Sequence, residues 1–266
     1  MPTIRVNGVD LYYESSGSGP ETVVFSHGLL MSAEMFREQV RFLSPNYRVV
    51  AYDHRGQGRS DLAARDHDMD TLAADAAALI EALGVGPCHF AGLSMGGFVA
   101  LRLAARRPEL LRSCILLDTS AEPEPPRNVS RYRLLSWVLR LLGTGAVVDK
   151  VMPIMFGRTF LADPARAELR AEWRGRLLGL RRSIHRAVTG VIERRGVEDE
   201  LQRISLPTLV LVGEEDVATP PAKAERIQAA IRGSRLARIP RAGHSSTIEN
   251  PAAVNAALAE FLSSVT

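Results

Sequence analysis

Cysteine is scarce in this chain of 266 residues: only Cys88 and Cys114 occur, both within apolar runs. Neither has the spacing to a second cysteine or histidine that a metal site requires, so we expect buried, reduced thiols and no metal. The chain also lacks an uninterrupted apolar stretch of about 18 residues, which a membrane-spanning helix needs. Residues 1–6 lack the apolar segment of a secretory signal. We therefore predict a cytoplasmic protein without a membrane span.

Net charge is also small, at +3, but it is unevenly distributed. Residues 127–195 contain 15 Lys or Arg against five Asp or Glu, and the remainder of the chain is correspondingly acidic. Solvated helix faces, an anionic substrate, or docking of one part of the chain on the other would each explain this asymmetry. The basic residues are not interleaved with aromatics, so we predict no nucleic-acid partner.

Short apolar runs and helical periodicities alternate along most of the chain. Residues 4–6 and 9–14 predict a hairpin around Asn7-Gly8. Further strands are predicted at 22–26, 47–52, 87–93, 111–118, 208–212 and 235–240, and helices at 33–43, 72–83, 95–106 and from 220 and 251 onward. Thr219 is expected to cap the helix that begins at Pro220. This alternation favours an α/β fold with a mostly parallel sheet and helices on both faces.

One block interrupts the alternation. Between about residues 120 and 205 the patterns are helical only, with Pro123, Pro125 and Pro126 at the entrance and a helix starting at Asp163-Pro164. An all-helical insertion between two strands is interpreted as a lid over the edge of the sheet where ligands bind. We therefore predict a core domain of residues 1–119 and 206–266 and a helical cap of residues 120–205.

A candidate nucleophile stands in Gly92-Leu93-Ser94-Met95-Gly96. The Gly-x-Ser-x-Gly pattern alone is modest evidence for a nucleophile. Here, however, it directly follows a predicted strand and directly precedes a predicted helix. That context suits a serine on a sharp, strained turn whose glycines let the two arms approach. The turn exposes the hydroxyl and points the first N–H groups of the helix toward it.

A serine hydroxyl needs a nearby base. His244 lies between the last strand and the last helix, where loops at the carboxyl ends of parallel strands converge. The remaining histidines are placed less well: His89 lies within a strand, His67 in an acidic surface segment and His185 in the cap, where a direct role stays open, while His27 and His54 belong to turn motifs.

An acid should orient that histidine. Asp216 follows the penultimate strand and completes the chain order Ser94, Asp216, His244 expected for this nucleophile turn. Glu214 and Glu215 are near rivals, and Asp118 is a more distant one.

With these motifs the sequence resembles the α/β-hydrolase superfamily over nearly its whole length. The resemblance rests on His27-Gly28, the segment Asp53-His54-Arg55-Gly56-Gln57-Gly58-Arg59-Ser60, Gly92–Gly97, residues 213–220 and Gly243-His244. Within the superfamily it is most similar to the 3-oxoadipate enol-lactonase and carboxylesterase group, with non-haem haloperoxidases close behind. It implies an eight-stranded sheet, an oxyanion hole at the N–H groups of Leu29 and Met95, and a structural role for residues 53–60.

The predicted function is hydrolysis of a carboxylic ester or lactone bond in a small, partly apolar substrate through an acyl-enzyme on Ser94, without a cofactor. Alternatives with the same three residues are carbon–carbon bond hydrolysis and cofactor-free haloperoxidase or perhydrolase activity. A receptor for a small molecule is a further alternative. Homo-oligomerisation is left open.

Two groups of side chains in the helical block concern substrate recognition. The large apolar residues are expected to pack the block onto the core, and some to line the pocket: Trp137, Met152, Met155, Phe156, Phe160 and Trp173. The arginines could meet a substrate carboxylate: Arg127, Arg131, Arg133, Arg158, Arg181 and Arg182.

Overall fold

The computed structural model describes residues 2–63 and 65–265, and its centre is one sheet of eight strands in the order β1-β2-β4-β3-β5-β6-β7-β8. The pairs β1–β2 and β2–β4 are antiparallel, and the strands from β4 to β8 are parallel to their neighbours. The predicted mostly parallel sheet is confirmed. The strands are β1 (Thr3–Val6), β2 (Val9–Ser16), β3 (Thr22–Ser26), β4 (Arg48–Tyr52), β5 (Cys88–Leu93), β6 (Leu111–Leu117), β7 (Thr208–Gly213) and β8 (Arg235–Ile239).

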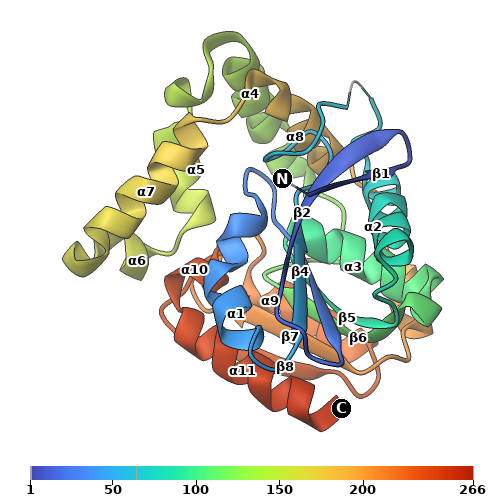
Figure 1. Ribbon diagram of the computed structural model, residues 1–266. Helices are drawn as coiled ribbons and strands as arrows, with labels where there is room; N and C mark the ends of the chain where they lie inside the picture. Colours follow the sequence, from blue (N-terminus) through green and yellow to red (C-terminus); the bar gives the residue numbers. More distant parts are fainter. Residues whose placement is uncertain (1, 64, 266) are drawn as a thin grey trace.

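Helices cover both faces of the sheet (Figure 1). One face packs against α2 (Met69–Leu83), α3 (Met95–Arg106) and α9 (Pro221–Ala230). The other face packs against α1 (Arg37–Leu43) and α11 (Pro251–Val265), and the short α10 (Ser246–Glu249) precedes α11.

The parallel strands read as continuous apolar runs because both of their faces are buried. In β3, Val24 points into the core under α2 and α3, while Val23 and Phe25 point into the opposite core. All three side chains have no exposed surface. Cys88 and Cys114 lie in the same layer, buried and unpaired, as predicted.

Local residues account for both ends of α2. The Asp68 carboxylate accepts hydrogen bonds from the N–H groups of Asp70 and Thr71, so α2 begins at Met69, three residues earlier than predicted. Gly84 ends the helix in the left-handed conformation, with φ of 60°. The helix predicted at 33–43 begins as a 3₁₀ turn, Ala33–Phe36, before α1.

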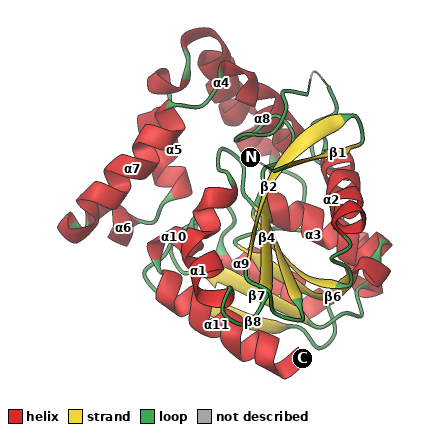
Figure 2. Cartoon of the chain, viewed as in Figure 1, coloured by secondary structure: helices red, strands yellow, loops and turns green. Residues whose placement is uncertain are grey.

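Residues 120–205, which we call the insertion, lie between β6 and β7. Its described residues form helices and turns without a strand (Figure 2). The division of the chain into a core domain and a cap stays a prediction. The helices are α4 (Pro126–Leu142), α5 (Val148–Met155), α6 (Arg158–Ala162), α7 (Ala167–Leu178), α8 (His185–Ile192) and the 3₁₀ turns η3 (Thr144–Ala146), η4 (Pro164–Arg166), η5 (Arg182–Ile184) and η6 (Glu198–Arg203).

Apolar side chains join the insertion to the core. Met152, Met155, Phe156, Phe160 and Trp173 are buried in the same cluster as residues of β3, β4 and α11. Their predicted packing role agrees with this placement. Trp137 differs from these residues, because its side chain is 61% exposed on α4. The expectation that Trp137 packs the insertion onto the core is therefore wrong.

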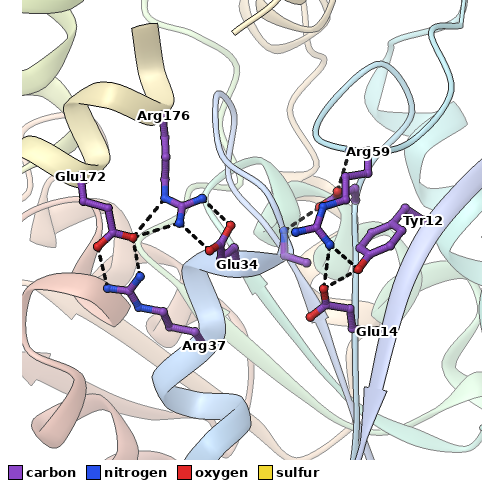
Figure 3. A network of polar contacts seen from close by, with 9 residues as sticks. Tyr12, Glu14, Glu34, Arg37, Arg59, Glu172 and Arg176 are labelled. Atoms are coloured by element: carbon purple, nitrogen blue, oxygen red, sulfur yellow. Dashed lines mark hydrogen bonds and ion pairs between the residues drawn. The ribbon is translucent and has the colours of Figure 1, made fainter. Parts of the chain in front are cut away.

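Ion pairs also join the two parts (Figure 3). Arg37 of α1 donates to Glu172 of α7, with 3.0 Å between Nη2 and Oε2. Arg176, one turn further along α7, binds both Glu172 and Glu34 of the core. Part of the excess positive charge of the insertion is therefore used in docking on the core.

Candidate active site

Ser94 lies on the turn between β5 and α3, and the backbone there is strained. Its φ of 52° and ψ of −110° fall outside the regions favoured by ordinary residues. Gly92 and Gly96 make the turn feasible, because a Cβ on Gly92 would lie 2.1 Å from the carbonyl oxygen of Gly96 and one on Gly96 would lie 1.9 Å from that of Ser26. Thr119 fastens the turn by donating to the carbonyl oxygen of Ser94 at 2.8 Å.

The structure brings Ser94, His244 and Asp216 together from three loops at the carboxyl edge of the sheet. The Oγ atom of Ser94 lies 2.8 Å from Nε2 of His244, and Nδ1 of His244 lies 2.8 Å from Oδ2 of Asp216. All three are largely buried, with exposed fractions of 8%, 4% and 3% in the order Ser94, His244, Asp216. The hydroxyl, imidazole and carboxylate form one continuous hydrogen-bonded chain.

Asp216 is held by the loop that follows it. Its Oδ1 atom accepts from the N–H groups of Ala218 and Thr219, at 2.8 and 2.9 Å. The Thr219 hydroxyl donates to Oδ2 at 2.7 Å and lies 3.2 Å from Nδ1 of His244. Thr219 therefore does not cap α9 as predicted, because its hydroxyl binds the carboxylate instead; α9 begins at Pro221 without a side-chain cap.

The rival carboxylates point elsewhere. Glu214 is exposed, and Glu215 accepts hydrogen bonds from the N–H and the hydroxyl of Thr159 in the insertion. Asp118 is fully buried and accepts from the N–H of Gly213 at 2.7 Å and the hydroxyl of Ser246 at 2.5 Å. Of the four acids, Asp216 is the one hydrogen-bonded to His244.

The pKa values of the histidine and its acid are moved apart by their contact. Burial by itself lowers the pKa of His244, but the charge of Asp216 and the hydrogen bond to it raise the pKa above the ordinary histidine value. Burial by itself raises the pKa of Asp216, yet His244 and the donors from Thr219 hold it below the ordinary value. Burial and the nearby Asp216 charge raise the pKa of Asp118 well above its usual range. An ionised Asp216 beside a proton-accepting imidazole is the arrangement that a general base requires.

The two expected oxyanion donors follow the neighbouring strands β5 and β3. Met95 is the first residue of α3, so its N–H has no carbonyl one turn earlier in the helix. Leu29 follows His27-Gly28 after β3, and the next N–H, of Leu30, donates to Oε1 of Gln57 at 3.1 Å. The amide of Gln57 also contacts the sulfur of Met95. Gln57 thus connects the two backbone segments that carry the expected donors.

The segment 53–60 supports the loop after β3. Asp53 accepts from the N–H of Ala33 at 2.7 Å and of Arg59 at 2.8 Å, and His27 accepts from the N–H of His54 at 3.0 Å. These bonds join the two loops by backbone donors, and none of them involves Ser94. The segment therefore has the structural place that the resemblance implies.

Among the described residues, no histidine other than His244 is hydrogen-bonded to the Ser94 side chain. His89 is hydrogen-bonded to Ser113 inside the sheet, and His185 lies at the start of α8, with its ring bonded to the carbonyl oxygen of Arg182. His67 is buried and bonded to the carbonyl oxygen of Ala63, so its assignment to the surface is wrong.

A family model described as "Alpha/beta hydrolase family" matches residues 23–257. The chain belongs to the alpha/beta hydrolase family.

Relatives of this alpha/beta hydrolase differ in their reported activities. A putative carbamate hydrolase, RutD, of Pseudomonas syringae pv. syringae is 30% identical over 251 residues, which cover 91% of this chain and 93% of the relative. Among solved structures, a thermophilic esterase from Thermogutta terrifontis has a TM-score of 0.90 and 32% identity, covering 99% of this chain and 97% of the esterase. An enol-lactonase from Burkholderia xenovorans LB400 has a TM-score of 0.91 and 27% identity, covering 98% of this chain and all of the lactonase.

In this alpha/beta hydrolase, sequence reasoning missed a contact between the insertion and the histidine loop. Glu249 of α10 is buried, and its carboxylate accepts from the N–H of Gly157 in the insertion at 2.8 Å. The same carboxylate accepts from the N–H groups of Gly243 and Ser245, at 3.0 and 3.1 Å, on either side of His244. Burial raises the pKa of Glu249 to about 7 despite these three donors.

Gly157 and Gly243 are in backbone contact. A Cβ on Gly243 would lie 2.3 Å from the nitrogen of Gly157, and one on Gly157 would lie 2.7 Å from the nitrogen of Gly243. The spacing of 92 residues between Gly157 and Glu249 leaves no local pattern from which the contact could be predicted.

A cavity of about 310 Å³ lies between the insertion and the core. Its wall includes Leu30, next to the expected donor Leu29, together with Trp173, Leu180 and Arg181 of the insertion. Within residues 2–63 and 65–265, no group of three or more His, Cys, Asp or Glu residues could hold a metal ion, and no helix has the length and apolarity to cross a membrane.

Proposed function

We propose that this chain hydrolyses carboxylic ester or lactone bonds, with Ser94 as nucleophile, His244 as general base and Asp216 as the acid that orients it. The hydrogen-bonded chain from Ser94 through His244 to Asp216, with two contacts of 2.8 Å, is the observation that carries the proposal. The neutral imidazole removes the hydroxyl proton while Oγ attacks the carbonyl carbon of the substrate. Asp216 stabilises the imidazolium that results.

The tetrahedral oxyanion is assigned to the N–H groups of Leu29 and Met95. Each such donor is worth about 3–4 kcal/mol of transition-state stabilisation. The proton on His244 then passes to the leaving alcohol oxygen as the carbon–oxygen bond breaks, which leaves an acyl group on Ser94. Water, deprotonated by the same imidazole, releases the acid and restores the hydroxyl. In a lactone the acid and alcohol leave as one molecule.

The substrate we propose is small and partly apolar. The cavity beside Leu30 is lined by apolar residues and by charged residues of both signs, such as Glu34 and Arg181, while Ser94 and His244 lie outside its lining. The esterase and enol-lactonase neighbours support this class. The carbamate hydrolase relative makes carbamates a second class, cleaved by the same attack on a carbonyl carbon.

A fluorophosphonate probe tests the nucleophile directly. We expect the folded protein to be labelled on Ser94, and Ser94→Ala to abolish labelling. Ser245→Ala is the matched control, since its hydroxyl is also buried beside His244 but has no hydrogen-bond partner among the described residues. This variant should label as the wild type does. Folded wild-type protein that resists labelling would favour a receptor over a hydrolase.

A substrate panel then separates the chemistries: p-nitrophenyl esters of short and long acyl chains, lactones, aryl carbamates and β-diketones. Ester or lactone turnover that depends on Ser94 is expected. Diketone cleavage without ester turnover would contradict the proposal and assign carbon–carbon bond hydrolysis, and peroxide-dependent bromination alone would assign perhydrolysis.

A further inference from the structure

The insertion exposes a stripe of large apolar side chains on α4. Leu134 and Trp137 are each 61% exposed and Leu141 is 47% exposed. At about 100° per residue, these three side chains fall within about 60° of the helix circumference. We call them the apolar stripe. Single exposed apolar residues are common on proteins, but an aligned set containing tryptophan marks an interaction surface.

Arginines flank the stripe on both sides. By the same helical geometry, Arg133 and Arg140 follow one edge of the apolar stripe, and Arg127 and Arg131 follow the other. All four are exposed. Residues 126–142 contain no Asp or Glu. Within the described chain, Arg133 pairs with Glu193 at 3.2 Å, while the other three form no ion pair.

The opposite face of α4 packs against the rest of the insertion, so the exposure of the apolar stripe does not come from a helix without packing partners. Leu139 is buried in a cluster with Val147, Ile184 and Ala187, and Ser136 is buried beside them. In Figure 1, α4 lies at the end of the insertion farthest from the C-terminal helix α11. The stripe therefore lies on the solvent-exposed face of α4, opposite the side chains that anchor the helix.

The apolar surface continues beyond the end of α4. Leu142 is 69% exposed, and Leu178, at the end of α7, is 40% exposed. The two chain segments are joined there, because the Thr144 hydroxyl donates to the carbonyl oxygen of Leu178 at 2.7 Å. Arg182 reaches the carbonyl oxygen of Leu141 at 2.9 Å. The edge of the insertion thus repeats the combination of exposed leucines and a cation.

We propose that this face of α4 docks on an anionic lipid surface. A narrow apolar stripe with tryptophan, flanked by arginines, is the pattern of a helix that lies in the plane of a membrane interface. The leucines and Trp137 enter the acyl boundary, while the arginine stems extend to the headgroup phosphates. The surface lies on the insertion, and lipid binding itself does not depend on the proposed hydrolase activity.

Charge favours lipid over a second copy of the chain. A two-fold dimer would bring the same patch of both copies together, and the four arginines of each would face those of the other. A soluble acidic macromolecule would meet the arginines but would leave no role for the apolar stripe. An anionic bilayer offers both negative charge and an apolar interior.

Tryptophan fluorescence provides the test, because the chain has only two tryptophans and Trp173 is 1% exposed. Titration with vesicles of phosphatidylglycerol and phosphatidylcholine should shift the emission to shorter wavelength. Pure phosphatidylcholine vesicles should give little shift, and added salt should weaken the response. Trp137→Phe should still bind in a flotation assay but lose the shift. The Trp173→Phe variant should keep it, and where that variant does not fold, the comparison of wild type with Trp137→Phe decides.

Two pairs of arginine variants test the charge. Arg131→Gln combined with Arg140→Gln should weaken binding to the anionic vesicles roughly 30-fold. Arg232→Gln combined with Arg235→Gln is the matched control, since both arginines are exposed, have no ion pair among the described residues and lie away from α4. Its binding should equal that of the wild type.

Several outcomes would overturn the proposal. These are absence of binding to anionic vesicles, equal loss in both arginine pairs, or a Trp137 shift that appears on concentration alone with a change in mass by light scattering. A Trp137 shift on concentration with a change in mass would show that this surface binds a second copy of the chain. A shift with soluble polyglutamate but not with vesicles would assign it to an acidic protein.

Discussion

Gly157→Ala is the most informative single change in the contact between the insertion and the expected active site. Gly157 has ordinary backbone angles, φ of −69° and ψ of 157°, so alanine introduces no backbone strain. Its Cβ, however, would lie 2.7 Å from both the nitrogen of Gly243 and Oε2 of Glu215, and 3.0 Å from Oε2 of Glu249. The nitrogen of Gly243 is a backbone atom, so it cannot be moved aside by a side-chain rotation. The insertion or the histidine loop must therefore move.

Overpacking of this kind costs about 1–3 kcal/mol, partly offset by about 0.4–1 kcal/mol from the reduced entropy of the unfolded chain. We expect a net loss of about 1–2 kcal/mol, with Tm falling by about 2–4 °C for each kcal/mol. Because Gly243 precedes His244, displacement of the loop should lower kcat for an ester by roughly 10- to 100-fold.

Gly175→Ala is the matched control. A Cβ there meets nothing within 4 Å, and the residue lies inside α7. Alanine should stabilise the helix by about 0.5–1 kcal/mol and leave ester turnover unchanged. Scanning calorimetry and steady-state kinetics on both variants measure the difference. If Gly157→Ala keeps the Tm and kcat of the control, the insertion is not in firm contact with the histidine loop and our reasoning is wrong.

Three further changes test the polar interior. Ester turnover should fall as pH drops through the raised pKa of His244, because only the neutral imidazole accepts the proton. In Asp216→Asn the residual activity should decline at a lower pH than in the wild type, since the charge that raises the pKa of His244 is gone. An acidic decline at the same pH in both proteins would show that Asp216 does not raise this pKa. Thr219→Val removes a donor to the Asp216 carboxylate, and should cost about 1.5–3 kcal/mol in urea denaturation; an unchanged midpoint would mean that the bond contributes nothing. Asp75→Asn leaves the buried Arg55 guanidinium without its carboxylate and should cost about 3–5 kcal/mol, whereas joint replacement of both by Leu and Met should recover most of this loss.

Where secondary structure depended on neighbouring residues, the sequence predicted it closely. The helix over residues 95–106 agrees with α3, and the hairpin turn at Asn7-Gly8 places Val6 opposite Val9. The prediction of a helix cap failed because another polar group, only three residues away, competed for the same atom. Thr219 has the chemistry of a helix cap, but the Asp216 carboxylate takes its hydroxyl.

The residues of the expected active site also differ in how firmly the sequence alone could select them. Ser94 and His244 were selected by their places after strands, since parallel strands bring their carboxyl ends to one edge of the sheet. The acid could not be selected so firmly, because Asp118, Glu215 and Asp216 all follow strands at that edge. Their side-chain directions separate them, and those depend on packing against the insertion and α10.

The sequence by itself determined the order of strands and helices, the serine turn and the residues that could act with it, because turn chemistry and apolar periodicity are local. Tertiary structure alone decided which carboxylate meets His244, how Glu249 and Gly157 join the insertion to the histidine loop, and which face of α4 stays in solvent. Those outcomes depend on groups that approach one another from distant positions, as Gly157 and Glu249 do across 92 residues, and no short-range pattern encodes such contacts.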